Sequence, residues 1–274
     1  MRRIWKNAVL GSLACLIASA ALAQSDGQTA AADDETGAAE SAIDPVAMEI
    51  AGSAARFLSG QKSMRFDWFV TYDDVVEGRE KITLIRSGTN AMIRGAGFIA
   101  NTERGDTLRD YYYDGETFTV ASPSEGFYSS AKFDGGFEAL LDAARERLDM
   151  ALPLWSLMSE TLGQNAVEDI LGAAYLGTTL LRGQEVHHLA FTEYDEDWQI
   201  WILTDPERPV PLMIVGTDPY QQGWPQYRAL LMDWSFDIDT PEGGFTYVPH
   251  ELDVAVAMPS LAPDAREQAI TGTK

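Results

Sequence analysis

Two four-residue segments have the Ser-x-x-Lys spacing with which penicillin-binding enzymes activate a nucleophilic serine. They are residues 59–62 (Ser-Gly-Gln-Lys) and 129–132 (Ser-Ser-Ala-Lys). The Ser-Asp-Asn and Lys-Thr-Gly segments that complete such a site do not accompany them. The sequence also contains no Gly-x-Ser-x-Gly elbow, phosphate-binding loop or dinucleotide fingerprint. We therefore predict a protein that is not an enzyme and has no catalytic residues or cofactor, with a hydrolase on an unrecognised constellation as the third hypothesis.

Histidines and clustered acidic residues are the candidates for metal binding. His187 and His188 are neighbours on a predicted strand, so their side chains point to opposite faces and cannot bind one ion together. The acidic residues 195–197 and 237–239 lack the glycine and the spaced oxygen ligands of a calcium loop. The sequence therefore predicts no metal site.

Large apolar side chains are the candidates for a ligand-binding surface. Residues 198–202 (Trp-Gln-Ile-Trp-Ile) are apolar on both faces of a strand, so this strand is expected to be covered on both sides or to face a cavity. The same residue types fill ordinary cores and line apolar cavities, so both interpretations stay open. The candidate ligand-binding residues are Phe66, Trp68, Tyr112, Phe118, Trp155, Met158, Trp198 and Trp201.

The first 23 residues have the three parts of a secretory signal peptide. Arg2, Arg3 and Lys6 precede an apolar run, and 21–23 (Ala-Leu-Ala) form a small-x-small cleavage site, so cleavage is expected after Ala23 and the mature protein is expected in the periplasm. Cys15 lies in the apolar run, so the mature chain has no cysteine; acylation of this residue as a lipoprotein is the minor alternative.

Charge and hydropathy limit the partners of the mature chain. The formal net charge is −22, and removal of the three signal-peptide cations brings it to −25, which argues against nucleic acid or anionic membrane surfaces as partners. No second apolar run reaches the roughly 20 residues that span a bilayer, so no transmembrane segment is predicted in the mature chain. Residues 24–43 are small, polar and acidic, which is typical of a disordered linker.

The remaining pattern predicts one domain over residues 44–250, followed by a C-terminal tail over 251–274. A helix is expected from Asp44 to Gly60, and the residues 137–148, 153–158 and 166–171 are expected to form a helical insert. This insert is predicted to be either a mobile lid or a fixed structural cover. About 11 strands are expected, at 64–72, 80–86, 90–97, 107–113, 116–122, 126–131, 174–181, 185–193, 197–203, 210–217 and 225–236, with a further edge strand possible at 252–256.

Turn signals support this strand assignment. Asp114-Gly115 lies between aromatic and β-branched residues, which is the strongest short-range signal for a β-hairpin. Ser87-Gly88 is predicted as another turn between strands. Short connections between consecutive strands indicate an antiparallel meander, and the fold class is therefore α+β, with helices packed against one large antiparallel sheet.

Several segments in this order resemble an uncharacterised family of predicted periplasmic proteins, the domain of unknown function numbered two thousand and ninety-two. The resemblance covers about residues 44–249, and its motifs are short and structural. They are 44–45 (Asp-Pro), 112–118 (Tyr-Tyr-Asp-Gly-Glu-Thr-Phe), 152–154 (Leu-Pro-Leu), 197–202 (Asp-Trp-Gln-Ile-Trp-Ile) and 225–227 (Pro-Gln-Tyr). The order of one helix, six strands, a helical insert and five strands also resembles the LolA/LppX-like superfamily.

The superfamily resemblance implies a curved, half-open barrel whose concave face is covered by helices, with a cavity between them that holds acyl chains. It implies no catalytic residues. In the superfamily's lipoprotein chaperone, a buried arginine of the sheet holds the closing helices through backbone hydrogen bonds, and the motifs above do not assign this role to a residue here. The leading hypothesis is a periplasmic, non-catalytic protein that carries or senses a lipid or other apolar ligand. The alternative is an envelope protein-interaction or regulatory module of the same fold.

Overall fold

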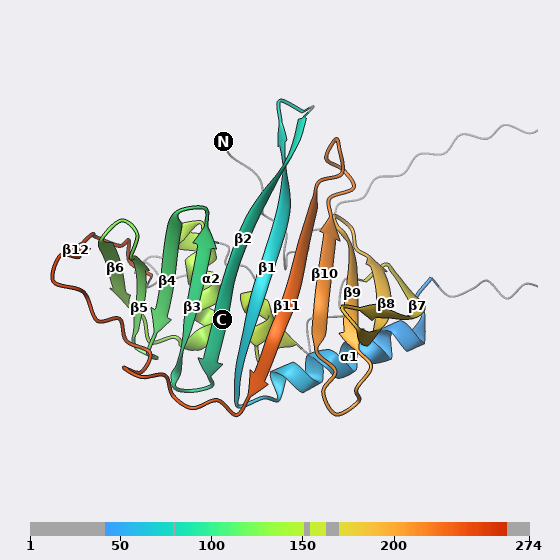
Figure 1. The fold of residues 1–274 in the computed structure, drawn as a ribbon, viewed down its shortest axis with the longest axis horizontal. Helices are drawn as coiled ribbons and strands as arrows, with labels where there is room; N and C mark the ends of the chain where they lie inside the picture. The colour runs from blue at the N-terminus through green and yellow to red at the C-terminus, as the bar shows by residue number, and fades with distance from the viewer. Residues whose placement is uncertain (1–41, 79, 151–153, 163–169, 262–274) are drawn as a thin grey trace, which may run out of the picture.

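The computed structural model describes residues 42–78, 80–150, 154–162 and 170–261. The predicted signal peptide, nearly all of the predicted linker and most of the predicted helix at 166–171 lie outside these residues. Within them, the predicted fold class is confirmed, since helices pack on one large, curved, open antiparallel sheet (Figure 1).

The sheet contains 12 strands in the order β12-β6-β5-β4-β3-β2-β1-β11-β10-β9-β8-β7. The first half consists of β1 (Ser63–Val76), β2 (Glu80–Ile93), β3 (Gly97–Arg104), β4 (Thr107–Tyr113), β5 (Thr117–Ser122) and β6 (Phe127–Lys132). The second half consists of β7 (Gly172–Leu181), β8 (Gln184–Thr192), β9 (Asp197–Leu203), β10 (Pro211–Thr217) and β11 (Gln226–Phe236). The two meanders join because β1 of the first half pairs with β11 of the second, so each half contributes long strands to the centre of the sheet.

The far edge of the first half carries one more strand. β12 (Val254–Ala255) pairs with β6 in parallel, whereas the other neighbours in the sheet are antiparallel. This strand coincides with the extra edge strand that the alternation at 252–256 predicts. It lies in the segment expected to be a C-terminal tail.

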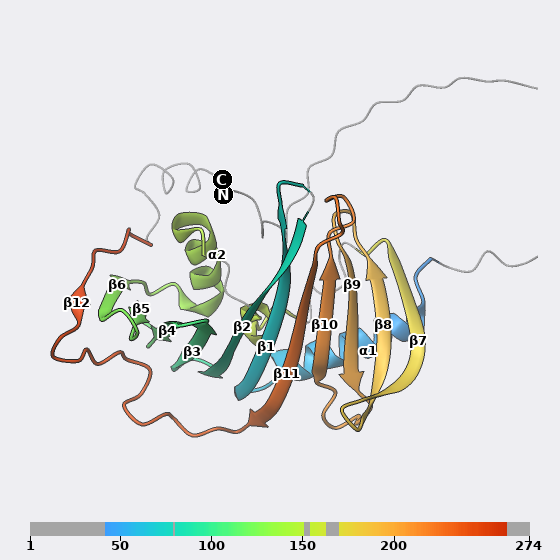
Figure 2. The same ribbon diagram turned by 45° about the horizontal axis from the view of Figure 1, so that its top comes forward.

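Within the described ranges, three helical elements lie on one face of the sheet. They are α1 (Pro45–Ser59), α2 (Gly136–Leu148) and the 3₁₀-helix η1 (Trp155–Met158). α1 contacts β7, β8, β9 and η1. α2 covers the strands of the first half, behind them in Figure 1 and above them in Figure 2. The covered face is therefore divided between α1 on one half and α2 with η1 on the other.

α1 begins where the sequence predicts. The carboxylate of Asp44 accepts a hydrogen bond from the backbone N–H of Val46 at 2.8 Å, and Pro45 is the first helical residue. The buried face of α1 consists mostly of alanines, which let the helix approach the sheet closely. These residues are Ala47, Ala51, Ala54, Ala55 and Leu58.

The alternation along β1 sets the main core. Met64, Phe66, Trp68, Val70 and Tyr72 are all buried on the helix-covered face, as the period of two predicts. Burial of these five large side chains in one row is worth several kcal/mol.

The predicted Asp114-Gly115 hairpin is confirmed. Asp114 Oδ1 accepts hydrogen bonds from the backbone N–H groups of Glu116 and Thr117, and Gly115 has a φ of +90°. The carboxylate thus closes the turn while glycine supplies the left-handed conformation.

The predicted turn at Ser87-Gly88 is wrong. Both residues lie inside β2, which continues to Ile93, and the connection to β3 is formed by residues 94–96. Gly88 is required for a different reason, because a Cβ here would lie 2.5 Å from Cζ2 of Trp68 and 2.1 Å from the backbone oxygen of Asn101. The glycine makes room for a tryptophan ring on the neighbouring strand instead of reversing the chain.

Candidate functional site

Five of the eight predicted ligand-binding residues meet on the helix-covered face. Phe66 and Trp68 come from β1, Phe118 comes from β5, and Trp155 and Met158 come from η1. All five are at most 2% exposed. The sequence-based prediction therefore groups residues that share one buried cluster, where they pack as part of the main core.

Trp155 is the centre of this cluster. Its ring centroid lies 4.5 Å from that of Phe98, 5.6 Å from that of Tyr111 and 6.4 Å from that of Phe118, each in an edge-on arrangement. Such aromatic pairs add to the free energy gained from burial alone. A single-turn helix thus inserts one large side chain into the aromatic surface of β3, β4 and β5.

The other three predicted residues lie elsewhere. Tyr112 points to the uncovered face, where its ring lies 5.3 Å from that of Tyr247. Trp198 belongs to the half of the sheet beneath α1, where it stacks on Phe191 at 4.1 Å. Trp201, three residues further along β9, points to the opposite face and stacks on His188 at 4.1 Å.

Arg94, which the motifs did not single out, connects the sheet to the helical cover. Its Nε donates to the backbone oxygen of Gln61 at 2.6 Å, Nη2 to that of Leu58 at 3.2 Å and Nη1 to that of Met158 at 2.9 Å. The side chain is 13% exposed, and Glu160 lies 3.7 Å away. Burial lowers the pKa of Arg94, and the carboxylate of Glu160 partly offsets this effect. One guanidinium therefore ties the end of β2 to both α1 and η1.

A second set of hydrogen bonds joins η1 to α2. The carboxylate of Glu138 accepts from the Ser159 hydroxyl at 2.9 Å and from the backbone N–H of Glu160 at 2.8 Å. The segment that carries Trp155 is therefore held at its C-terminal end by Arg94 on one side and by Glu138 on the other. A few hydrogen bonds from Arg94 and Glu138 thus hold η1 over a large apolar surface.

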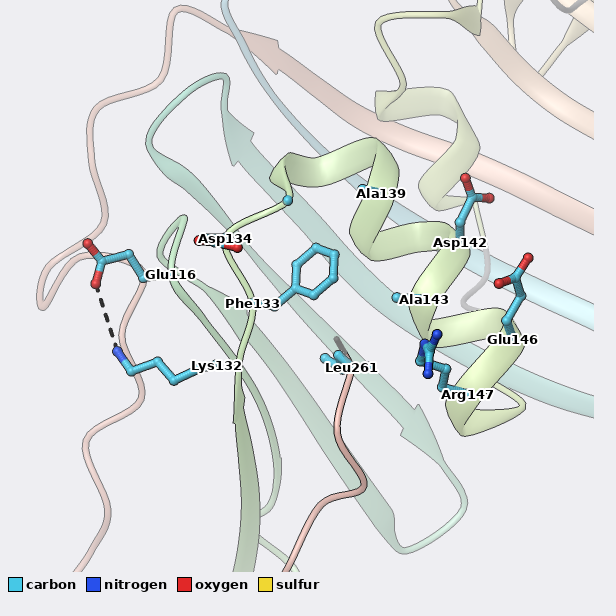
Figure 3. A pocket seen from close by; sticks show the side chains of 11 residues that line it. Glu116, Lys132, Phe133, Asp134, Ala139, Asp142, Ala143, Glu146, Arg147 and Leu261 are labelled. Atoms are coloured by element: carbon cyan, nitrogen blue, oxygen red, sulfur yellow. Dashed lines mark ion pairs between the residues drawn. The ribbon is translucent and has the colours of Figure 1, made fainter. Parts of the chain in front are cut away.

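A surface cavity of about 850 Å³ lies beside this cover, between α2 and the ends of β5 and β6 (Figure 3). Phe133, Ala139, Ala143 and Leu261 form its apolar part, and none of the eight predicted residues lines it. Charged side chains, including the ion pair between Lys132 and Glu116 at 3.8 Å, surround this apolar part.

The apolar part of the cavity is continuous with the core. Ala143 and Leu261 are buried members of the main cluster that contains Phe118 and Trp155, and Phe133 packs against the same cluster. The volume falls within the range of about 300–1,000 Å³ that is typical of small-molecule sites. An apolar ligand in this cavity would thus lie next to the aromatic surface that η1 covers.

The residues considered for catalysis and metal binding have structural partners. Ser59 donates to the backbone oxygen of Arg56, and Ser129 donates to that of Val256. The adjacent histidines point apart, since His187 contacts Tyr175 and His188 contacts Gln199. Within the described ranges, no group of three histidine or acidic side chains is placed to hold a metal ion.

Together, the sheet, its helical cover and the adjoining cavity define a protein of the open-sheet class in which an apolar surface is closed by short helices. The model of the predicted periplasmic protein family DUF2092 matches residues 47–258. The chain therefore belongs to this family. In the part of the chain that the structure describes, no helix is both long and apolar enough to cross a membrane.

Several solved structures are similar to this chain. LprF from Mycobacterium bovis is 11% identical with a TM-score of 0.44, and the alignment covers 74% of this chain and 99% of that protein. LppX, a lipoprotein from Mycobacterium tuberculosis, is 10% identical with a TM-score of 0.36, covering 72% and 98%. A LolA superfamily protein from Nitrosomonas europaea is 13% identical with a TM-score of 0.36, covering 73% and 97%. No curated protein matches this sequence.

Proposed function

We propose that this protein is a non-catalytic periplasmic binding protein, exported by its signal peptide, that carries or senses a lipid or another apolar molecule between the sheet and its helical cover. The observation that carries the proposal is the aromatic surface under η1, which is closed by one inserted tryptophan and adjoins an apolar cavity.

The energetics favour an acyl chain as the ligand. Each buried methylene is worth about 0.8 kcal/mol, so a chain of about 12 to 16 carbons contributes roughly 10 kcal/mol before ordering costs are paid. We infer that the chain enters at the cavity beside α2 and replaces Trp155 and Met158 on the aromatic surface. The contacts of Arg94 and Glu138 then act on the equilibrium between the closed and the ligand-bound forms.

The proposal can be tested by titrating the mature protein with a fluorescent polyene fatty acid. Wild-type protein should bind the probe saturably, and Trp155→Ala should associate several-fold faster because the cover no longer fills the surface. Trp224→Ala is the matched control, since this tryptophan is 67% exposed at a loop tip and should leave binding unchanged. The proposal fails if neither wild type nor Trp155→Ala binds the probe while both keep a native circular dichroism spectrum.

A second function, recognition of a protein partner in the envelope, is favoured by one specific observation. The tip of the β1–β2 hairpin and the β10–β11 loop lie against each other, because a Cβ on Gly223 would contact Val75. Together they expose four large apolar side chains, which is unusual for a solvent-facing surface. These residues are Val76, Ile82, Tyr220 and Trp224.

This surface can be tested by placing a photo-crosslinking residue at position 224 in cells. A single defined adduct from this position would support a protein partner. The matched control is position 194, because Tyr194 is 80% exposed in the β8–β9 loop, outside this surface. Equal and diffuse crosslinking from both positions would count against it.

A further inference from the structure

Arg86 is a cation on the helix-covered face that has no counterion among the described residues. It lies opposite Val70 in the β1–β2 register, and Val70 is part of the buried row of β1. Although the chain contains 42 acidic residues, no carboxylate among the described residues forms an ion pair with Arg86. The guanidinium instead lies over the ring of Tyr72, with Cζ 5.0 Å from the ring centroid.

The guanidinium also has an unused hydrogen-bond donor. Its Nε is shut off from solvent and has no hydrogen-bond partner in the part of the chain that the structure describes. Nearly all buried donors in proteins are paired, and an unpaired one on a charged group is costly. An unpaired buried donor on a charged group therefore indicates a position where a ligand can supply the acceptor.

A second unpaired donor lies on the same face of β2. Asn90 is fully buried, and its Oδ1 accepts a hydrogen bond from Trp68 Nε1 at 3.1 Å, which leaves its Nδ2 without a partner. Arg86 Nε and Asn90 Nδ2 are the two buried side-chain atoms of the described residues that lack a partner, and both are donors. The two unpaired groups on this face of β2 would therefore both be satisfied by a hydrogen-bond acceptor.

Two further phenols lie near the guanidinium, on β4 and β11. Burial raises the pKa of Tyr111 and of Tyr227, and the positive charge of Arg86 opposes this rise in both cases. These phenols stay protonated at neutral pH and cannot neutralise the arginine. The carboxyl group of Glu196 also acts on Tyr227, but it forms no ion pair with Arg86. Among the described residues, the surroundings of Arg86 therefore supply aromatic surface and hydroxyl groups but no carboxylate that pairs with it.

We propose that Arg86 binds the anionic oxygen headgroup, carboxylate or phosphate, of the ligand whose acyl chain lies on the adjacent aromatic surface. This inference rests on the proposed function and specifies the chemical class of the ligand. A guanidinium is suited to such groups because its planar donors match two oxygens at once. The apolar row of Phe66 and Trp68 continues from the position of Arg86 along the same face, so one ligand can use both.

The test compares three probes of equal chain length, namely tetradecanoate, tetradecyl phosphate and the neutral tetradecanol, by isothermal titration calorimetry. Wild-type protein should bind at least one of the two anions about 10- to 100-fold more tightly than the alcohol. The larger of the two anion preferences identifies whether a carboxylate or a phosphate is the better headgroup. Arg86→Gln should lower the affinity for both anions to about that for the alcohol and so abolish the preference, whereas Arg86→Lys should keep part of it.

Arg65→Gln is the matched control, because Arg65 lies on the uncovered face of the neighbouring strand and pairs with Asp67 at 3.2 Å. This variant loses the same charge and should keep the full preference for anions. Equal affinity of wild type for anions and alcohol, or a preference that survives Arg86→Gln, overturns the headgroup assignment while the binding of apolar chains stands. Absence of binding by all three probes overturns the proposed function as well.

Discussion

Replacement of Arg94 by methionine should loosen the helical cover. The substitution keeps an unbranched side chain but removes three donors that bond to backbone oxygens at 2.6, 2.9 and 3.2 Å. At about 1 to 1.5 kcal/mol each, these bonds contribute roughly 4 kcal/mol, and part of this is regained because a buried charge is no longer desolvated. We expect the free energy of unfolding to fall by about 2–3 kcal/mol, with the loss concentrated at η1.

Urea unfolding gives the total loss, and native-state hydrogen exchange shows where it occurs. The substitution should speed the exchange of the Leu157 and Ser159 amide protons, which bond within η1, more than it speeds exchange in the central strands. Arg65→Met is the control and should cost less than about 0.5 kcal/mol, because its ion pair is exposed. A loss below about 0.5 kcal/mol in Arg94→Met, with unchanged exchange at η1, would refute this reasoning.

Three other substitutions test particular features of the fold. Burial raises the pKa of Glu196 to about 7, so the folded form favours the protonated acid and loses stability as pH rises through 7. In urea unfolding, Glu196→Gln should therefore be more stable than wild type by roughly 2–3 kcal/mol at pH 8 and by under about 1 kcal/mol at pH 5. Gly88→Ala should lower the unfolding free energy by at least about 2 kcal/mol in the same assay, because the new Cβ would collide with Trp68. Burial alone would raise the pKa of Asp73, but hydrogen bonds from Thr83 and β11 lower it, so Asp73→Asn should cost about 1–2 kcal/mol at pH 7 and less as pH falls below 4 in acid titrations of stability.

Much of the sheet could be predicted because its signals are local. The predicted strands of the second meander agree with β7 to β11 to within two residues at each end, since the apolar alternation and the turn residues lie within single strands and their connections. The first meander was harder to predict. Gly88 has the local pattern of a turn, and only its long-range contact with Trp68 explains why the strand continues.

The candidate site could be predicted only in part, for the same reason. Phe66, Trp68 and Phe118 follow from the period of the strands, whereas the contact between Trp155 and these strands depends on how the insert folds back. The role of Arg94 depends on backbone oxygens that are 33 to 64 residues away in the sequence. No spacing rule encodes contacts of that kind.

Native mass spectrometry of the mature protein, purified without detergent from a periplasmic extract, tests the central claim most directly. We predict a second population whose added mass is removed by lipid extraction and identified in the extract as an acyl-chain molecule, and which decreases in Trp68→Leu. A protein that shows only its own mass, before and after incubation with periplasmic lipid extract, would contradict the claim. That result would favour the second proposed function, in which the exposed tip of the β1–β2 hairpin and the β10–β11 loop bind a protein partner.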